Sequence, residues 1–181
     1  SDYLLTIQKS GETMMALLND ILDFEKIESG SMETEKIDFD LPKLIRDILT
    51  LMAGHAADKN VLLKPNIQTD MPPVFIGDPT RLRQVLLNLV NNAIKFTENG
   101  EITIHARIES RPEEADAPYA IYFAVEDTGI GISEEAQKRL FNPFEQANQS
   151  VARKYGGTGL GLAISQRLIT AMGGTIRVSS E

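Results

Sequence analysis

The segments "EITIHARIE" (residues 101–109) and "YAIYFAVED" (residues 119–127) decide the expected fold. The first is rich in β-branched residues and the second in β-branched and aromatic ones, and the polar loop at 110–118 suits a hairpin connection. We therefore expect two neighbouring antiparallel strands. Helices and strands alternate irregularly elsewhere, which favours an α/β (α+β) fold over a doubly wound parallel one. The expected architecture is a two-layer sandwich, in which helices cover one face of a mixed sheet.

Caps, prolines and turns place the elements around this hairpin. Asp78 followed by Pro79 predicts a helix that ends near Thr97, and Asp40 predicts another that ends near residue 58. Pro65 pushes a strand at 61–67 toward a sheet edge. The other expected elements are a short strand around 37–39, a short helix at 133–140, an aperiodic segment at 141–157, a helix at 158–172 and a last strand at 175–180.

The first segment of the chain carries a heptad pattern of apolar residues. The seam consists of Leu4, Ile7, Gly11, Met14, Leu18 and Ile21, and only Gly11 interrupts it. Further apolar residues widen this face, as is typical of a helix bundle. One helix cannot bury such a face alone, so we expect a hairpin partner, a second copy of the chain, or both. The pattern ends at Gly30, a helix stop.

Composition excludes several classes of function. The 181 residues carry a formal net charge of −8, whereas nucleic-acid-binding surfaces are basic. The chain has no cysteine and so no disulfide or thiolate metal site. Its longest apolar run, at 119–125, is too short to cross a membrane. We expect no nucleic-acid partner, no membrane contact in this segment and a cytoplasmic location.

A polar face on the helix at 79–97 is the first candidate site. Asn88, Asn92 and Lys95 are spaced i, i+4 and i+7, so they share one side of the helix. Amide oxygens suit Mg²⁺, and lysine is a common partner of phosphate. An ordinary solvated face explains the same spacing equally well.

Two glycine-containing segments are the next candidates. In "VEDTGIGI" (residues 125–132), Asp127 could accept a hydrogen bond from an exocyclic amine, with Gly129 and Gly131 allowing a base close to the backbone. A tight turn that needs positive φ is the alternative. In "YGGTGLGLAIS" (residues 155–165), four glycines precede a helix, which suits either a phosphate cradle or a hinge. The latter segment matches neither the P-loop nor the dinucleotide-binding pattern.

Four motifs in this order resemble the N, G1, F and G2 boxes of sensor histidine kinases: "NLVNNAIKFT", "DTGIGI", "FNPF" and "GGTGLGLAI". The segment "LLNDILDFEKIESG" is similar to the second dimerisation helix and linker of that family, especially of its hybrid members. The resemblance implies the histidine-kinase and gyrase-like ATPase (Bergerat) fold. It also implies a dimerisation helix at 1–30 and an ATP-binding catalytic domain at 31–181, truncated before its last strand.

The resemblance implies roles for individual residues. Asn92 would bind Mg²⁺, Lys95 would bind the ATP phosphates, and Asn88 would lie beside them as a catalytic residue. Asp127 would accept from the adenine amino group. Phe141 and Phe144 would anchor the ATP lid. The other implied nucleotide-binding residues are Gly129, Gly131, Ile132, Gly157, Thr158, Gly159, Leu160 and Gly161.

Asn88 and the two histidines indicate which reaction the family resemblance implies. Gyrase-like and chaperone ATPases carry glutamate at the position of Asn88, and an amide cannot act as a general base. The implied activity is therefore that of a protein-histidine kinase, which transfers the γ-phosphoryl of ATP to a histidine and then to a receiver aspartate. His55 and His105 lack the acidic follower of the family's phosphoacceptor, so we expect the segment to bind ATP without phosphorylating itself.

The implied partners are a second copy through the helical bundle and a receiver domain of a response regulator or of the same protein. The resemblance also allows a parent protein anchored in the bacterial inner membrane. A degenerate module that binds nucleotide or a partner without kinase activity is the alternative.

Overall fold

The computed structural model describes residues 2–112, 114, 117–145 and 158–180. They form two compact units, of which one spans Thr34–Gly131 and the other joins Ser1–Glu33 with Ile132–Glu181. The elements of the first unit are β1 (Ile37–Phe39), α2 (Leu41–Ala57), β2 (Leu62–Ile67), β3 (Phe75–Gly77), α3 (Pro79–Phe96), β4 (Glu101–Ser110) and β5 (Ala120–Asp127). Those of the second unit are α1 (Asp2–Glu28), α4 (Glu134–Arg139) and α6 (Gly161–Ala171).

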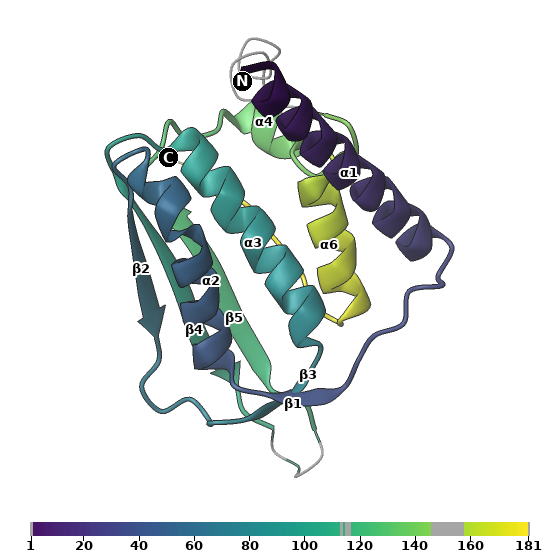
Figure 1. Ribbon diagram of the computed structural model, residues 1–181. Coiled ribbons are helices and arrows are strands. Elements are labelled where there is room, and N and C mark those ends of the chain that lie inside the picture. Colours follow the sequence, from purple (N-terminus) through teal and green to yellow (C-terminus); the bar gives the residue numbers. More distant parts are fainter. Residues whose placement is uncertain (1, 113, 115–116, 146–157, 181) are drawn as a thin grey trace. The chain divides into compact units, whose positions relative to one another are not determined.

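The sheet of the first unit is mixed, as expected. Its strand order is β2-β4-β5, with β2 parallel to β4 and β4 antiparallel to β5. The strand with Pro65 lies at the edge of this sheet. Helices α2 and α3 pack against each other and lie on one face of the sheet (Figure 1). The expected layer arrangement is therefore confirmed.

Alternation along β4 places the core between the sheet and the two helices. Ile102, Ile104 and Ala106 are buried, while the residues between them are more exposed. Facing them, Ile48 of α2 and Val90 of α3 are fully buried. Asp40 and Asp78 cap the two helices by accepting from the N–H groups of Lys43 and Arg81. The N-caps explain where these two helices begin, and the apolar pattern explains which of their faces packs against the sheet.

A second, two-stranded sheet pairs β1 with β3 antiparallel. The sequence analysis did not predict β3, because three residues are too few to show alternation. Phe39 and Phe75 pair across this ribbon, with ring centroids 6.4 Å apart. Asp78, directly after β3, also accepts from the N–H of Glu35 near β1 at 3.0 Å.

Two expectations for the C-terminal part are wrong. The expected strand at 175–180 is absent from the described residues: its alternating exposure is present, but no backbone ladder forms. A strand needs a paired neighbour, which alternation alone does not supply. The last helix begins at Gly161 and not at Thr158, because Gly159 has a φ of +70° that no right-handed helix accepts.

We predict that Asp78→Ala costs more stability than Asp40→Ala. Asp78 is 7% exposed and accepts two backbone hydrogen bonds, from Arg81 and Glu35. Asp78→Ala removes the cap and leaves the N–H of Glu35 without its acceptor, which together should cost about 2–4 kcal/mol of stability. Loss of the exposed cap Asp40 should cost about 1 kcal/mol. Urea denaturation measures both losses. Equal losses would show that the Glu35 contact contributes nothing.

Candidate nucleotide-binding site

Helix α3 carries the first group of predicted site residues. Asn88, Asn92 and Lys95 are each half-buried, whereas the core face of the same helix, including Leu86 and Val90, is almost fully buried. The three polar side chains thus stand at the margin of the core and not on a fully solvated face. This intermediate burial suits side chains that hold a ligand.

The environment of Lys95 favours an anionic neighbour. Its ammonium lies 5.1 Å from the ring centroid of Phe96. Burial, and secondarily the charge of Lys59, lower the pKa of Lys95 below its ordinary value. Burial and the Lys59 charge both disfavour the charged form of Lys95, and a phosphate beside it would offset them.

The predicted G1 turn is built around Asp127 at the end of β5. The carboxylate oxygen Oδ1 of Asp127 accepts from the N–H of Gly129 at 2.8 Å, which fixes the orientation of the carboxylate. Gly131 has a φ of +74°, so the alternative interpretation of this segment, a tight turn that needs positive φ, is confirmed. The turn and a fixed acceptor are compatible, because the same bond makes both.

A close contact joins this turn to the end of α3. A Cβ on Gly129 would stand 2.4 Å from the carbonyl oxygen of Phe96 and 2.9 Å from Oγ1 of Thr97. The N–H of Ile130 donates to that Phe96 carbonyl at 3.2 Å. The residues predicted for phosphate and for adenine are therefore held together within one unit, by backbone contacts that need glycine.

The predicted F and G2 segments meet in the other unit. The N–H of Phe144 donates to the carbonyl of Gly159 at 2.9 Å, and a Cβ on Gly159 would stand 3.0 Å from Phe144 Cα. The ring of Phe144 is 67% exposed, so it is not a core aromatic, whereas Phe141 is half-buried. Gly157 and most of the predicted lid lie outside the described residues.

The start of α6 offers backbone donors and one engaged hydroxyl. Leu160 precedes α6 without a side-chain cap bond, and its own side chain is fully buried, so it could serve a nucleotide only through its backbone. Thr158 accepts from the N–H of Leu160 at 3.2 Å and donates to Oδ2 of Asp20, on α1, at 3.1 Å. Burial raises the pKa of Asp20, and the Thr158 hydrogen bond partly offsets this effect. The half-buried Ile132 donates its N–H to Oγ of Ser180 at 2.8 Å.

The donor set fits a magnesium ion that arrives with its nucleotide. In the described part of the chain, no three His, Cys, Asp or Glu side chains gather as a metal-binding group. Mg²⁺ commonly takes one or two protein oxygens and completes its shell with water and phosphates. The amide of Asn92 can supply such an oxygen, and Lys95 can supply the balancing charge.

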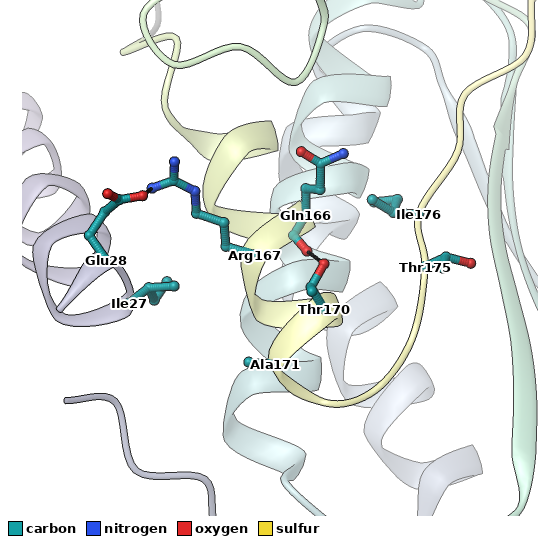
Figure 2. A pocket seen from close by; sticks show the side chains of 8 residues that line it. All are labelled: Ile27, Glu28, Gln166, Arg167, Thr170, Ala171, Thr175 and Ile176. Atoms are coloured by element: carbon teal, nitrogen blue, oxygen red, sulfur yellow. Dashed lines mark hydrogen bonds and ion pairs between the residues drawn. The ribbon is translucent and has the colours of Figure 1, made fainter. Parts of the chain in front are cut away.

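A separate cavity of about 510 Å³ lies between the end of α1 and α6 (Figure 2). Arg167 lines it, pairs with Glu28 at 2.5 Å and lies with its guanidinium carbon 4.0 Å from the ring centroid of Phe24. None of the predicted nucleotide-binding residues lines this cavity. The contact fixes α1 against α6 within this unit.

The two histidines lie on a helix and a strand of the first unit. His55 is exposed on α2. His105, on β4, contacts Asn66 at 3.0 Å and Glu126 at 2.9 Å through its two ring nitrogens. Both imidazole nitrogens of His105 are thus engaged on the sheet.

Sequence reasoning missed two residues of this region. Thr97 is fully buried beside Gly129, and Lys59 donates to the carbonyls of Ile94 and Lys95. Both were placed only near the ends of helices, and the contacts of Lys59 span about 35 positions in the chain. Short motifs carry no signal for such a separation. Among the described helices, none combines the length and the apolarity that a membrane span requires.

We predict that Gly129→Ala disrupts the joint between α3 and the G1 turn. The new methyl group would overlap the Phe96 carbonyl, and such overpacking costs about 1–3 kcal/mol. Nucleotide binding should be lost with it. Gly54→Ala is the matched control, because a Cβ there meets nothing within 4 Å and should stabilise α2 by about 0.5–1 kcal/mol. Urea denaturation and nucleotide titration check both variants; an unchanged Gly129→Ala protein would contradict the prediction.

Comparison with known proteins shows the family of the chain. The profile of the histidine kinase-, DNA gyrase B- and HSP90-like ATPases matches residues 77–181. The signal transduction histidine-protein kinase BarA of Escherichia coli (strain K12) is 46% identical over 180 residues, which are 99% of this chain and 19% of BarA. The chain thus spans about a fifth of that relative.

Two solved structures extend the likeness to the fold. Full-length ShkA in complex with AMPPNP superimposes with a TM-score of 0.83 at 33% identity, over 99% of this chain and 35% of ShkA. The histidine kinase ThkA in complex with the response regulator protein TrrA does so with a TM-score of 0.66 at 26% identity, over 96% of this chain and 45% of ThkA. The motifs, the joint between α3 and the G1 turn, and these matches lead to one conclusion: the chain belongs to the histidine kinase-, DNA gyrase B- and HSP90-like ATPase family.

Proposed function

We propose that the chain is the ATP-binding catalytic region of a hybrid-type sensor histidine kinase. It would bind Mg-ATP so that the γ-phosphoryl passes to a histidine and then to a receiver aspartate. The observation that carries this proposal is the half-buried polar face formed by Asn88, Asn92 and Lys95 on α3, the helix whose end contacts the G1 turn. Similarity to BarA over 99% of this chain supports it.

Each proposed residue has a chemical task that its position permits. Asn92 would bind Mg²⁺, Lys95 would neutralise phosphate charge, and Asn88 would orient the polyphosphate. The Asp127 carboxylate would accept from the adenine amino group beside Gly129 and Gly131. In the other unit, Ile132 and the backbone of Gly157, Thr158, Gly159, Leu160 and Gly161 would contact the nucleotide.

Asn88 favours a kinase over an ATPase. Its amide cannot take a proton from water at neutral pH, so the side chain would leave ATP intact until a better nucleophile arrives. Neither His55 nor His105 suits that role: the former has no acidic follower, and the latter has both ring nitrogens engaged. We propose that the phosphoacceptor is a histidine outside these 181 residues.

Helix α1 supports a bundle partner. Most of its described large apolar side chains are exposed, with Leu4 at 73%, Met14 at 64% and Leu22 at 57%. A face of this kind marks an interaction surface. We propose that residues 1–30 form a dimerisation helix that pairs with a second copy of the chain, and that 31–181 form the catalytic domain. A receiver domain is the proposed phosphoryl acceptor, because the related ThkA forms a complex with a response regulator protein.

We predict that Asp127→Asn weakens ATP binding and shifts the preference toward GTP. Oδ1 of Asp127 is held by the Gly129 N–H, so the asparagine oxygen would keep this bond and its NH₂ would face the base. Two donors would then oppose each other at adenine, and ATP affinity should fall about tenfold or more. The 6-oxo group of guanine could accept from that NH₂. Calorimetry measures both affinities.

Glu126→Gln is the matched control for this experiment. Glu126 is the adjacent exposed carboxylate and contacts His105, away from the G1 turn. Its substitution should leave both nucleotide affinities unchanged. Equal ATP and GTP affinity in the wild-type protein and in Asp127→Asn would refute the adenine assignment.

We predict that the chain binds ATP but does not phosphorylate itself. The test is incubation with γ-labelled ATP and magnesium, alone and with an added helix that carries a histidine followed by an acidic residue. Label should appear only on the added helix, since Asn88 activates water poorly and the acceptor pattern is missing.

Two outcomes would change this interpretation. Acid-labile label on the chain alone, lost in His55→Gln or His105→Gln, would make that histidine an acceptor. ATP binding without transfer to any supplied helix or to the full-length parent would favour the degenerate binding module.

A further inference from the structure

Lys59 lies in the turn between α2 and β2, far in sequence from the polar face of α3. Its ammonium donates to the carbonyl oxygens of Ile94 at 3.0 Å and Lys95 at 2.7 Å. Both carbonyls belong to the last turn of α3. A side chain from another element therefore closes the end of the helix that bears the proposed phosphate-binding residues.

Helix ends need such a donor. The last carbonyls of an α-helix have no intrahelical partner, and they form the negative end of the helix dipole. After α3 the chain turns into an extended conformation at Thr97, with φ −116° and ψ 133°, so no glycine cap follows. Lys59 supplies both the missing donors and a positive charge at this end.

The turn that carries Lys59 is itself fixed. The N–H of Asn99 donates to the carbonyl of Lys59 at 3.1 Å, and the N–H of Leu62 donates to Gly100 at 2.9 Å. The side chains of Asn60 and Asn99 are bonded at 3.3 Å. The turns after α2 and after α3 thus form one bonded pair, which limits the directions open to the Lys59 side chain.

Three successive carbonyls at this helix end accept from outside the helix. Those of Ile94 and Lys95 accept from Lys59, and that of Phe96 accepts from Ile130 of the G1 turn. Lys59 thus holds the backbone of Lys95 at the end of α3 that also contacts the G1 turn. Its charge also adds to burial in lowering the pKa of Lys95, which makes a bound anion more favourable.

We infer that Lys59 is a positioning residue, which sets the direction of Lys95 toward the polyphosphate of a bound nucleotide. This inference rests on the proposed nucleotide function. Lys59 contributes through the α3 backbone and its own charge, without a contact to adenine. Its loss should therefore weaken the phosphate-dependent part of the affinity and spare the adenosine part.

The test compares ATP, ADP and adenosine binding in the presence of magnesium, by calorimetry for the nucleotides and by ligand-observed NMR for adenosine. Lys59→Met keeps much of the side-chain length without the charge and should weaken ATP and ADP about tenfold. Adenosine affinity should change less than about twofold by the same reasoning. Lys59→Arg should restore most of the ATP affinity, because it keeps the charge and the donors.

Lys64→Met is the matched control. Lys64 lies on β2, is partly exposed and pairs with Glu101, so its loss removes a lysine from the same unit without touching α3. Its nucleotide affinities should match the wild type. Thermal melts verify folding, and Lys59→Gln, whose shorter neutral side chain removes the charge from the two carbonyls, replaces Lys59→Met if the latter does not fold.

The outcomes separate the inference from the proposed function. Equal loss for ATP and adenosine, or no loss for ATP in Lys59→Met or Lys59→Gln, would overturn the positioning role. A wild-type protein that binds no ATP would instead overturn the proposed function. Loss confined to ATP and ADP, with rescue in Lys59→Arg, would support the inference.

Discussion

The contact between Gly129 and the Phe96 carbonyl is the constraint on which the described site depends. A Cβ at position 129 would lie 2.4 Å from this oxygen, which leaves no space for it. The turn after β5 can therefore approach the end of α3 this closely only with glycine at that position. The contact places the turn that follows Asp127 against the end of α3 that follows Lys95. Sheet, helix and turn then hold the proposed binding groups in place before a ligand arrives. Little free energy is therefore lost in ordering these groups on binding.

The division of labour between local and distant contacts follows from this joint. Locally, the helix spacing puts Asn88, Asn92 and Lys95 on one face, and the Asx-type bond of Asp127 fixes its carboxylate. Distant contacts do the rest: Lys59 closes the helix end and Ile130 binds it to the turn. Loss of a local group should remove one interaction with the ligand, whereas loss of a distant one should change several by small amounts.

Sequence patterns predicted α3, the hairpin and the edge strand well, because caps, prolines and alternation are local signals. They missed β3, whose three residues pair with β1, and Lys59, whose contacts join distant parts of the chain. They overstated the strand at 175–180, since alternation describes a half-buried extended segment whether or not a neighbour pairs with it. The site residues on α3 and in the G1 turn were predicted from motifs and stay predictions, whereas the glycine contact between the two elements is visible only in the structure.

The bond between Thr158 and Asp20 has a consequence for communication along the chain. The hydroxyl of Thr158 can donate one hydrogen bond, and the carboxylate of Asp20 on α1 accepts it. If a nucleotide phosphate accepted that hydrogen bond instead, nucleotide binding and the contact with α1 would compete for the same donor. Reciprocity then applies: the factor by which nucleotide loosens Asp20 equals the factor by which a tightened Asp20 contact expels nucleotide. A rotation of α1 that changes the Asp20 contact would in that case change the fraction of the protein that holds ATP. The hydroxyl of Thr158 would couple the two.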